Sequence, residues 1–115
     1  MNQIAFINGV KVAVADSSME ALKSTLTTPA GQNPAEYLML LSSWYNSLTV
    51  NDREIVIKIV KEAIDTTVFS FLCVLDGVRA VENSRNKGIF KLYYQKGDNI
   101  ILLNDPDEDY LHDIW

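Results

Sequence analysis

A long apolar stripe in the middle of this chain constrains its fold more than any other feature. From residue 56 to residue 75, apolar side chains recur at the three- and four-residue spacing of one helix face. These residues are Val56, Ile59, Val60, Ala63, Ile64, Val68, Phe71, Leu72 and Leu75. Asp52 and Glu54 precede the stripe, where the positive end of a helix dipole favours acidic side chains. The pattern predicts a central helix of about six turns that begins at Asn51 or Asp52.

The second half of this stripe, residues 66–75, is open to another interpretation. It is rich in β-branched and aromatic residues and is followed by Asp76-Gly77, a pair typical of hairpin turns. The segment could therefore be a buried strand that pairs with residues 78–82. We favour the helix because the helical spacing continues without a break from Val56, and Gly77 can then end it.

Two shorter helices are expected before the long one. Ser17 and Glu20 have the spacing of a capping box, which predicts a helix that ends before the loop at residues 28–32. Asn33 can cap the next helix, and Pro34 suits its first position. The apolar residues of this second helix are Leu38, Leu41, Tyr45 and Leu48, with Tyr37 and Trp44 on an adjoining face.

The two ends of the chain show strand patterns. Residues 3–7 and 10–14 are rich in β-branched side chains and flank Asn8-Gly9, which predicts an N-terminal β-hairpin. Toward the C-terminus, three short segments separated by polar turns predict a three-stranded antiparallel meander. These segments are residues 78–82, 89–95 and 100–103. We therefore expect one α+β domain, residues 1–115, in which the long helix covers the sheet.

The composition is that of an ordinary globular domain. Apolar residues make up 48% of the chain and charged residues 22%, which is enough apolar material for a real core. Cys73 is the only cysteine and lies in an apolar run, so we expect a buried thiol, no intrachain disulfide and a reducing, cytoplasmic location. The apolar run at residues 66–75 is far shorter than the roughly 20 residues that a transmembrane helix needs.

The charge of the chain argues against two classes of partner. Its formal net charge is −5, and its ten Lys and Arg residues are scattered singly rather than gathered in a stripe. Nucleic acids and anionic membrane surfaces both require clustered positive charge. We therefore expect neither partner, and a weak preference for basic proteins.

The acidic C-terminal segment is the main candidate site. Asp105, Asp107 and Asp109 have the spacing of the first three acidic ligands of an EF-hand loop. Tyr110 stands where that loop requires glycine, so the segment is not an EF-hand. A looser cation site that also uses Asp113 is an alternative function.

The interpretation we favour for this segment is an anchored acidic turn. Acidic residues before a last helical turn would favour its N-terminal dipole. Leu111, Ile114 and Trp115 would then return the chain to the body of the domain.

His112 is the only histidine, which limits the chemistry available. With Cys73 as the only thiol, one chain cannot build a tetrahedral Cys/His zinc site. We assign no metal, cofactor or catalytic residue. A Cys73–His112 nucleophile pair is disfavoured because a thiol in an apolar run resists ionisation. A small hydrolytic enzyme that uses His112 with a nearby acid is the second alternative.

The aromatic residues give the remaining functional signal. Tyr and Trp are more numerous than a small core can enclose, and such residues often form contacts at protein interfaces. Tyr93 shares a strand face with Lys91 and Gln95 and is the best candidate for exposure. We therefore expect a non-catalytic protein-interaction module, inhibitor- or immunity-like, that binds another protein or itself. Its expected contact residues are Tyr93, Asp105, Asp107, Asp109, Tyr110, His112 and Asp113.

Overall fold

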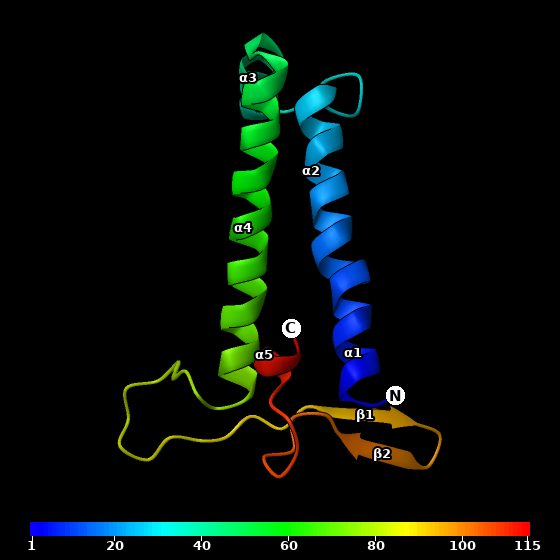
Figure 1. Cartoon of the computed structure of the whole chain (residues 1–115), viewed down its shortest axis with the longest axis vertical. Coiled ribbons are helices and arrows are strands. Elements are labelled where there is room, and N and C mark those ends of the chain that lie inside the picture. The colour runs from blue at the N-terminus through cyan, green and yellow to red at the C-terminus, as the bar shows by residue number, and fades with distance from the viewer.

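The computed structural model describes residues 1–115 as two long helical arms with a small sheet at one end (Figure 1). Its elements are α1 (Gln3–Val10), η1 (Lys11–Asp16), α2 (Ser17–Thr27), α3 (Glu36–Ser47), α4 (Val50–Leu75), β1 (Tyr93–Lys96), β2 (Asn99–Leu102) and α5 (Leu111–Ile114). One arm is the continuous helix α1–η1–α2, and the other is α4. Helix α3 lies at the far end of the arms, opposite the sheet and α5.

The predicted N-terminal hairpin is wrong, because these residues are helical. The Asn2 side chain caps α1 by accepting a hydrogen bond from the backbone N–H of Ala5 at 2.8 Å. Neither Asn8 nor Gly9 has the positive φ angle of a hairpin turn. Ile7 is fully buried against other parts of the chain, and such tertiary burial outweighs the modest strand preference of β-branched residues.

The segment η1 joins α1 and α2 as a π-helix. Its wider turns bond each N–H to a carbonyl five residues back, as Ser17 does with Val12. A π-helical turn contains more residues than an α-helical turn. Segment η1 therefore changes which residues of the arm point toward α4. Ile7, Ala15 and Leu26 are thereby all buried along the arm. Helix α2 begins at Ser17 and ends before the loop at residues 28–32, as predicted, but no capping hydrogen bond forms at its start, because the arm is already helical there.

Helix α4 confirms that residues 66–75 are helical. It starts one residue before Asn51, after Thr49, whose hydroxyl accepts a hydrogen bond from Asp52 N at 3.2 Å. Gly77 has a φ of +77°, so it ends the helix as predicted. Helix α4 is the longest helix at 26 residues, yet neither it nor any other helix has an apolar stretch sufficient for a membrane crossing.

The predicted three-stranded meander is also wrong, since the sheet has two strands. Strand β1 pairs antiparallel with β2, from Tyr93 opposite Leu102 to Lys96 opposite Asn99. Residues 78–82 form no strand, because the backbone N–H groups of Val78 and Arg79 both donate to Cys73 O at the end of α4. Two strands alone are only marginally stable in water, so the hairpin depends on its contacts with the rest of the chain.

The core is small and lies where the arms meet α5. Ile7, Leu72 and Leu111 form its fully enclosed centre, and Ile114 and Trp115 pack against it. This confirms that the C-terminal residues return to the body in one helical turn. Cys73 is buried nearby as a free thiol, also as predicted.

Most of the chain lies outside this core. Only 8 of 115 residues are buried, and the radius of gyration is 18.6 Å. A compact chain of this length has a radius of gyration of about 13 Å. The accessible surface is 8532 Å², whereas a compact monomer of 12.9 kDa exposes about 6300 Å². The single chain therefore leaves much apolar surface uncovered.

The burial of Ile7 predicts a large difference between two isoleucines of α1. Ile7→Ala should lower the free energy of unfolding by about 2–5 kcal/mol, because it leaves a cavity in the core. Ile4→Ala is the matched control; Ile4 is 59% exposed, so the change should stay within about 0.5 kcal/mol. Urea denaturation followed by circular dichroism measures both. Equal losses would show that Ile7 is not buried against Leu72 and Leu111.

Candidate interaction surface

Two polar side chains of α3 bind the end of α2. Ser42 is buried, and its hydroxyl donates to Leu26 O at 2.8 Å. The Asn46 side-chain amide donates to Thr27 O at 3.0 Å. Both carbonyls belong to the last turn of α2, where the helix itself offers no N–H partner. Helix α3 therefore turns its polar face inward to satisfy them.

Several apolar residues of α3 face solvent, whereas Leu38 and Tyr45 are half-buried. Tyr37, Leu40, Leu41 and Trp44, which we call the α3 stripe, are 65%, 69%, 43% and 55% exposed. Their i, i+3, i+4, i+7 spacing places them on one side of the helix. No charged residue occurs from Tyr37 to Asn51. A helix face that only meets water normally carries charged residues, so the α3 stripe has the character of a contact surface.

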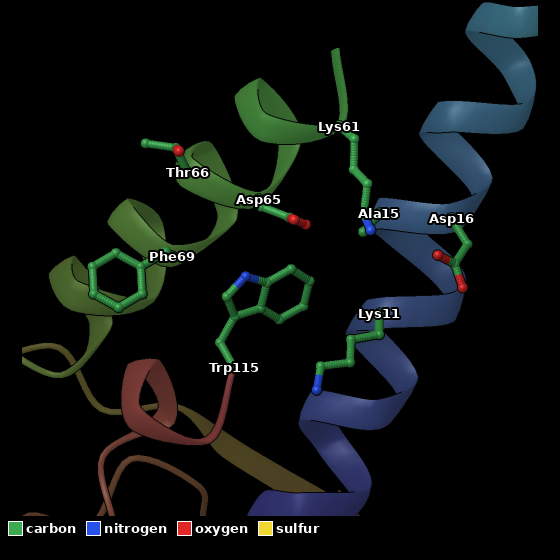
Figure 2. Close-up of a pocket in the computed structure, with 8 residues that line it drawn as sticks. All are labelled: Lys11, Ala15, Asp16, Lys61, Asp65, Thr66, Phe69 and Trp115. Carbon is green, nitrogen blue, oxygen red and sulfur yellow. The ribbon is translucent and has the colours of Figure 1, made fainter. Parts of the chain in front are cut away.

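A cleft between the two arms is the largest hollow of the molecule (Figure 2). It measures about 610 Å³ and is lined by Lys11, Ala15, Asp16, Lys61, Asp65, Thr66, Phe69 and Trp115. The Trp115 indole lies between the arms, with Lys11 Nζ 5.7 Å from its ring centre. Two lysines and two aspartates balance one another on the walls, so the cleft selects neither anions nor cations.

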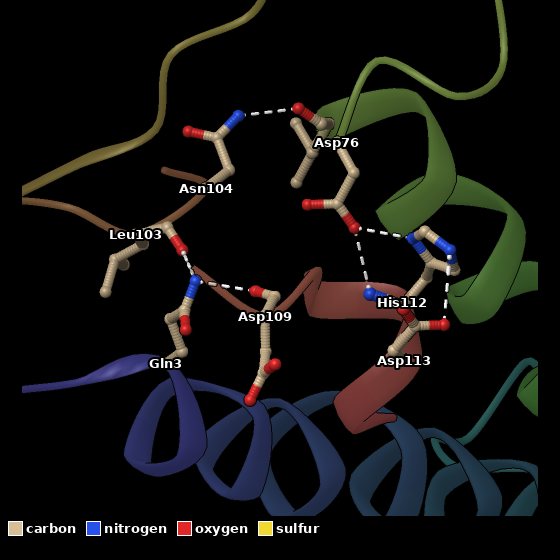
Figure 3. Close-up of polar contacts among 8 residues, drawn as sticks. Gln3, Asp76, Leu103, Asn104, Asp109, His112 and Asp113 are labelled. Carbon is tan, nitrogen blue, oxygen red and sulfur yellow. Dashed lines mark hydrogen bonds and ion pairs between the residues drawn. The ribbon is translucent and has the colours of Figure 1, made fainter. Parts of the chain in front are cut away.

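A buried carboxylate joins the end of α4 to α5 (Figure 3). Asp76 Oδ2 accepts a hydrogen bond from the backbone N–H of His112 at 2.9 Å and lies 2.7 Å from His112 Nδ1. The Asp76 side chain is only 1% exposed. The His112 ring is stacked on Tyr110 and meets the edge of Phe69, with ring centres 5.3 and 5.6 Å away. These contacts hold α5 against α4.

Carboxylate groups lie on both sides of the His112 ring. Its Nδ1 faces Asp76, and its Nε2 lies 3.5 Å from Asp113 Oδ1. Both ring nitrogens are therefore next to carboxylate oxygens. No hydroxyl or thiol is hydrogen-bonded to the ring, although nucleophilic catalysis needs one beside its base. The arrangement is suited to holding α5 against the end of α4.

The other contact residues expected from the sequence are spread over this end of the molecule. Tyr93 is exposed on β1. Asp105 accepts a hydrogen bond from Asp107 N at 3.0 Å, and Asp107 and Asp109 are exposed. Tyr110 and Asp113 both lie beside His112. No three acidic, histidine or cysteine side chains come close enough together to hold a metal ion.

Sequence reasoning missed the two features that the structure makes most prominent. It named Tyr93 as the best candidate for an exposed aromatic residue and did not single out the exposed face of α3, although the absence of charge from Tyr37 to Asn51 was a usable signal. It also missed Asp76, which lies 36 residues from His112 and resembles an ordinary turn residue before Gly77. Nothing in the local sequence indicates that pairing.

Comparisons with known proteins add no further information. No protein-family model matches this chain, and no curated protein or solved structure resembles it significantly. Function has to be inferred from the surfaces and side chains described above.

The contacts of Asp76 predict that the two carboxylates beside His112 differ in importance. Asp76→Ala should lower the free energy of unfolding by about 3 kcal/mol, because two N–H groups of His112 lose their acceptor. Asp113→Ala should change it by no more than about 0.5 kcal/mol, since Asp113 is 67% exposed. Urea denaturation of the two variants checks this, and a loss of similar size in both would show that Asp76 is not the anchor.

Proposed function

We propose that this chain is a cytoplasmic, non-catalytic protein-interaction module that binds another protein or itself. The observation that carries the proposal is the exposed α3 stripe. Four apolar anchors at this spacing on one helix are a common means of docking a helix against a partner. Tyrosine and tryptophan are also the residues that contribute most often to binding energy at interfaces.

The orientation of α3 supports this proposal, because the helix cannot bury its stripe by rotating. Rotation would separate Ser42 and Asn46 from the carbonyls of Leu26 and Thr27. The Ser42 bond is buried, and leaving the Leu26 carbonyl without a donor costs about 1–3 kcal/mol. The α3 stripe therefore stays exposed in the free chain. Binding of a partner would bury these apolar side chains without breaking the hydrogen bonds between α3 and α2.

The acidic end of the molecule supports a finer version of the proposal, an inhibitor- or immunity-like role toward a basic partner. Asp107, Glu108 and Asp109 are exposed and take part in no ion pair within the chain. They lie at the end opposite α3. Unpaired acidic groups attract a basic surface and speed its association more than they add affinity.

Photo-crosslinking in living cells tests whether the α3 stripe is in contact with protein. Tyr37 would be replaced by p-benzoylphenylalanine, which is aromatic and of similar shape. Because Tyr37 is exposed and belongs to the stripe, illumination should yield a discrete covalent adduct, seen as a band of higher mass on a denaturing gel. Adding Leu41→Lys should remove this adduct, since it puts a charge into the contact.

The same replacement at Tyr93 is the matched control, because Tyr93 is a similarly exposed tyrosine on the sheet. Adducts from position 93 alone would show that the sheet, and not the α3 stripe, is the contact surface. Absence of any discrete adduct from both positions would contradict the interaction module itself.

A further inference from the structure

We infer that the α3 stripe is covered by a second copy of this chain, in a dimer with twofold symmetry. The inference rests on the proposed function and names the partner. Its basis is the order of residues in the stripe, their lack of charge and the amount of surface that the single chain leaves exposed.

The stripe has the same residue order in both directions. It consists of an aromatic residue, two leucines and an aromatic residue, at positions 37, 40, 41 and 44. When two such helices pack antiparallel, Tyr37 of one faces Trp44 of the other, and Leu40 faces Leu41. A twofold axis between the leucines then repeats every contact, as the interface of a symmetric dimer requires.

The charges of the chain are compatible with this pairing. Glu36 is the only charged residue of α3 and lies at its first position. Antiparallel packing places the two copies of Glu36 toward opposite ends of the contact, about 14 Å apart along the helix axis. Asp107, Glu108 and Asp109 lie at the other end of each molecule (Figure 1), so these three acidic residues add little to the repulsion between two chains of charge −5.

The lack of charge also favours a second copy over an unrelated protein. Interfaces between proteins that associate transiently are about as polar as the rest of the surface, and their charges select the partner. Homodimer interfaces are more apolar. The α3 stripe lies in a segment, Tyr37 to Asn51, without any charged residue, and in this it resembles a homodimer interface.

The exposed area agrees with a dimer. The surface of 8532 Å² exceeds that of a compact monomer of this mass by about 2200 Å². Permanent homodimers bury about 2000–5000 Å² in total, or about 1000–2500 Å² from each chain. The surplus belongs to the open, two-armed shape of the whole chain, of which the α3 stripe is one exposed part, and it leaves room for an interface of this size.

Analytical ultracentrifugation of the purified full-length chain at micromolar concentration tests the inference. The expected mass is twice 12.9 kDa. Leu40→Glu should raise the dissociation constant about a hundredfold or more, because it puts an unpaired carboxylate at the centre of the contact. Leu40 is 69% exposed in the single chain, so the variant should still fold. Ile59→Glu, at a similarly exposed isoleucine of α4, is the matched control and should remain dimeric.

Mixing two variants tests the antiparallel geometry. Leu40→Glu and Leu41→Lys should each be monomeric alone. In the mixture, the new carboxylate at position 40 of one chain faces the new ammonium at position 41 of the other, while the remaining Leu41 faces Leu40. The two variants should therefore form a mixed dimer, whereas a stripe that binds an unrelated protein would not restore any association.

Each contrary result has a distinct meaning. A monomeric wild-type chain overturns the dimer, and the interaction module then stands only if position 37 still crosslinks in cells, in that case to a different protein. A dimer that Leu40→Glu leaves intact overturns the α3 stripe as the interface. A mixture of the two variants that remains monomeric overturns the antiparallel arrangement.

Discussion

The hydrogen bonds between α3 and the last turn of α2 determine which surface this molecule presents. Ser42 and Asn46 donate to the carbonyls of Leu26 and Thr27, which α2 cannot satisfy itself. Meeting this requirement turns the polar face of α3 inward. The opposite face, with its aromatic residues and leucines, is left in water. A local need for hydrogen bonds thus creates the apolar surface on which the proposed function depends.

Side-chain hydrogen bonds also hold the opposite end of the molecule together, around a small core. Gln3 donates to the backbone carbonyls of Leu103 and Asp109, which ties α1 to the C-terminal segment (Figure 3). Asn104 donates to Leu75 O and Phe90 O and accepts from Leu92 N, which ties the sheet to α4. Together with Asp76, these contacts order segments that bury few apolar side chains. The arms beyond them remain open along the cleft.

Helical spacing was the most reliable guide to this fold. It identified α4 across residues 66–75, where β-branched composition suggested a strand, and it placed Gly77 at the end of the helix. The N-terminal prediction failed because composition and Asn8-Gly9 indicated a hairpin, while Asn2 and the buried Ile7 stabilise a helix. The meander failed because Val78 and Arg79 bond to the end of α4 and residues 78–82 have no neighbouring strand. Strand pairing depends on distant partners, which a local pattern does not contain.

The sequence by itself determined the long helix, the buried thiol of Cys73, the return of Leu111 to the core and the uncharged stretch that contains α3. Only the tertiary structure decided which face of α3 meets water and which carboxylate binds His112. The reason is physical. Helical periodicity and capping involve residues three or four positions apart, so both can be recognised in the amino-acid sequence. The rotation of a helix about its axis and the pairing of Asp76 with His112 depend on groups that meet only after the chain has folded.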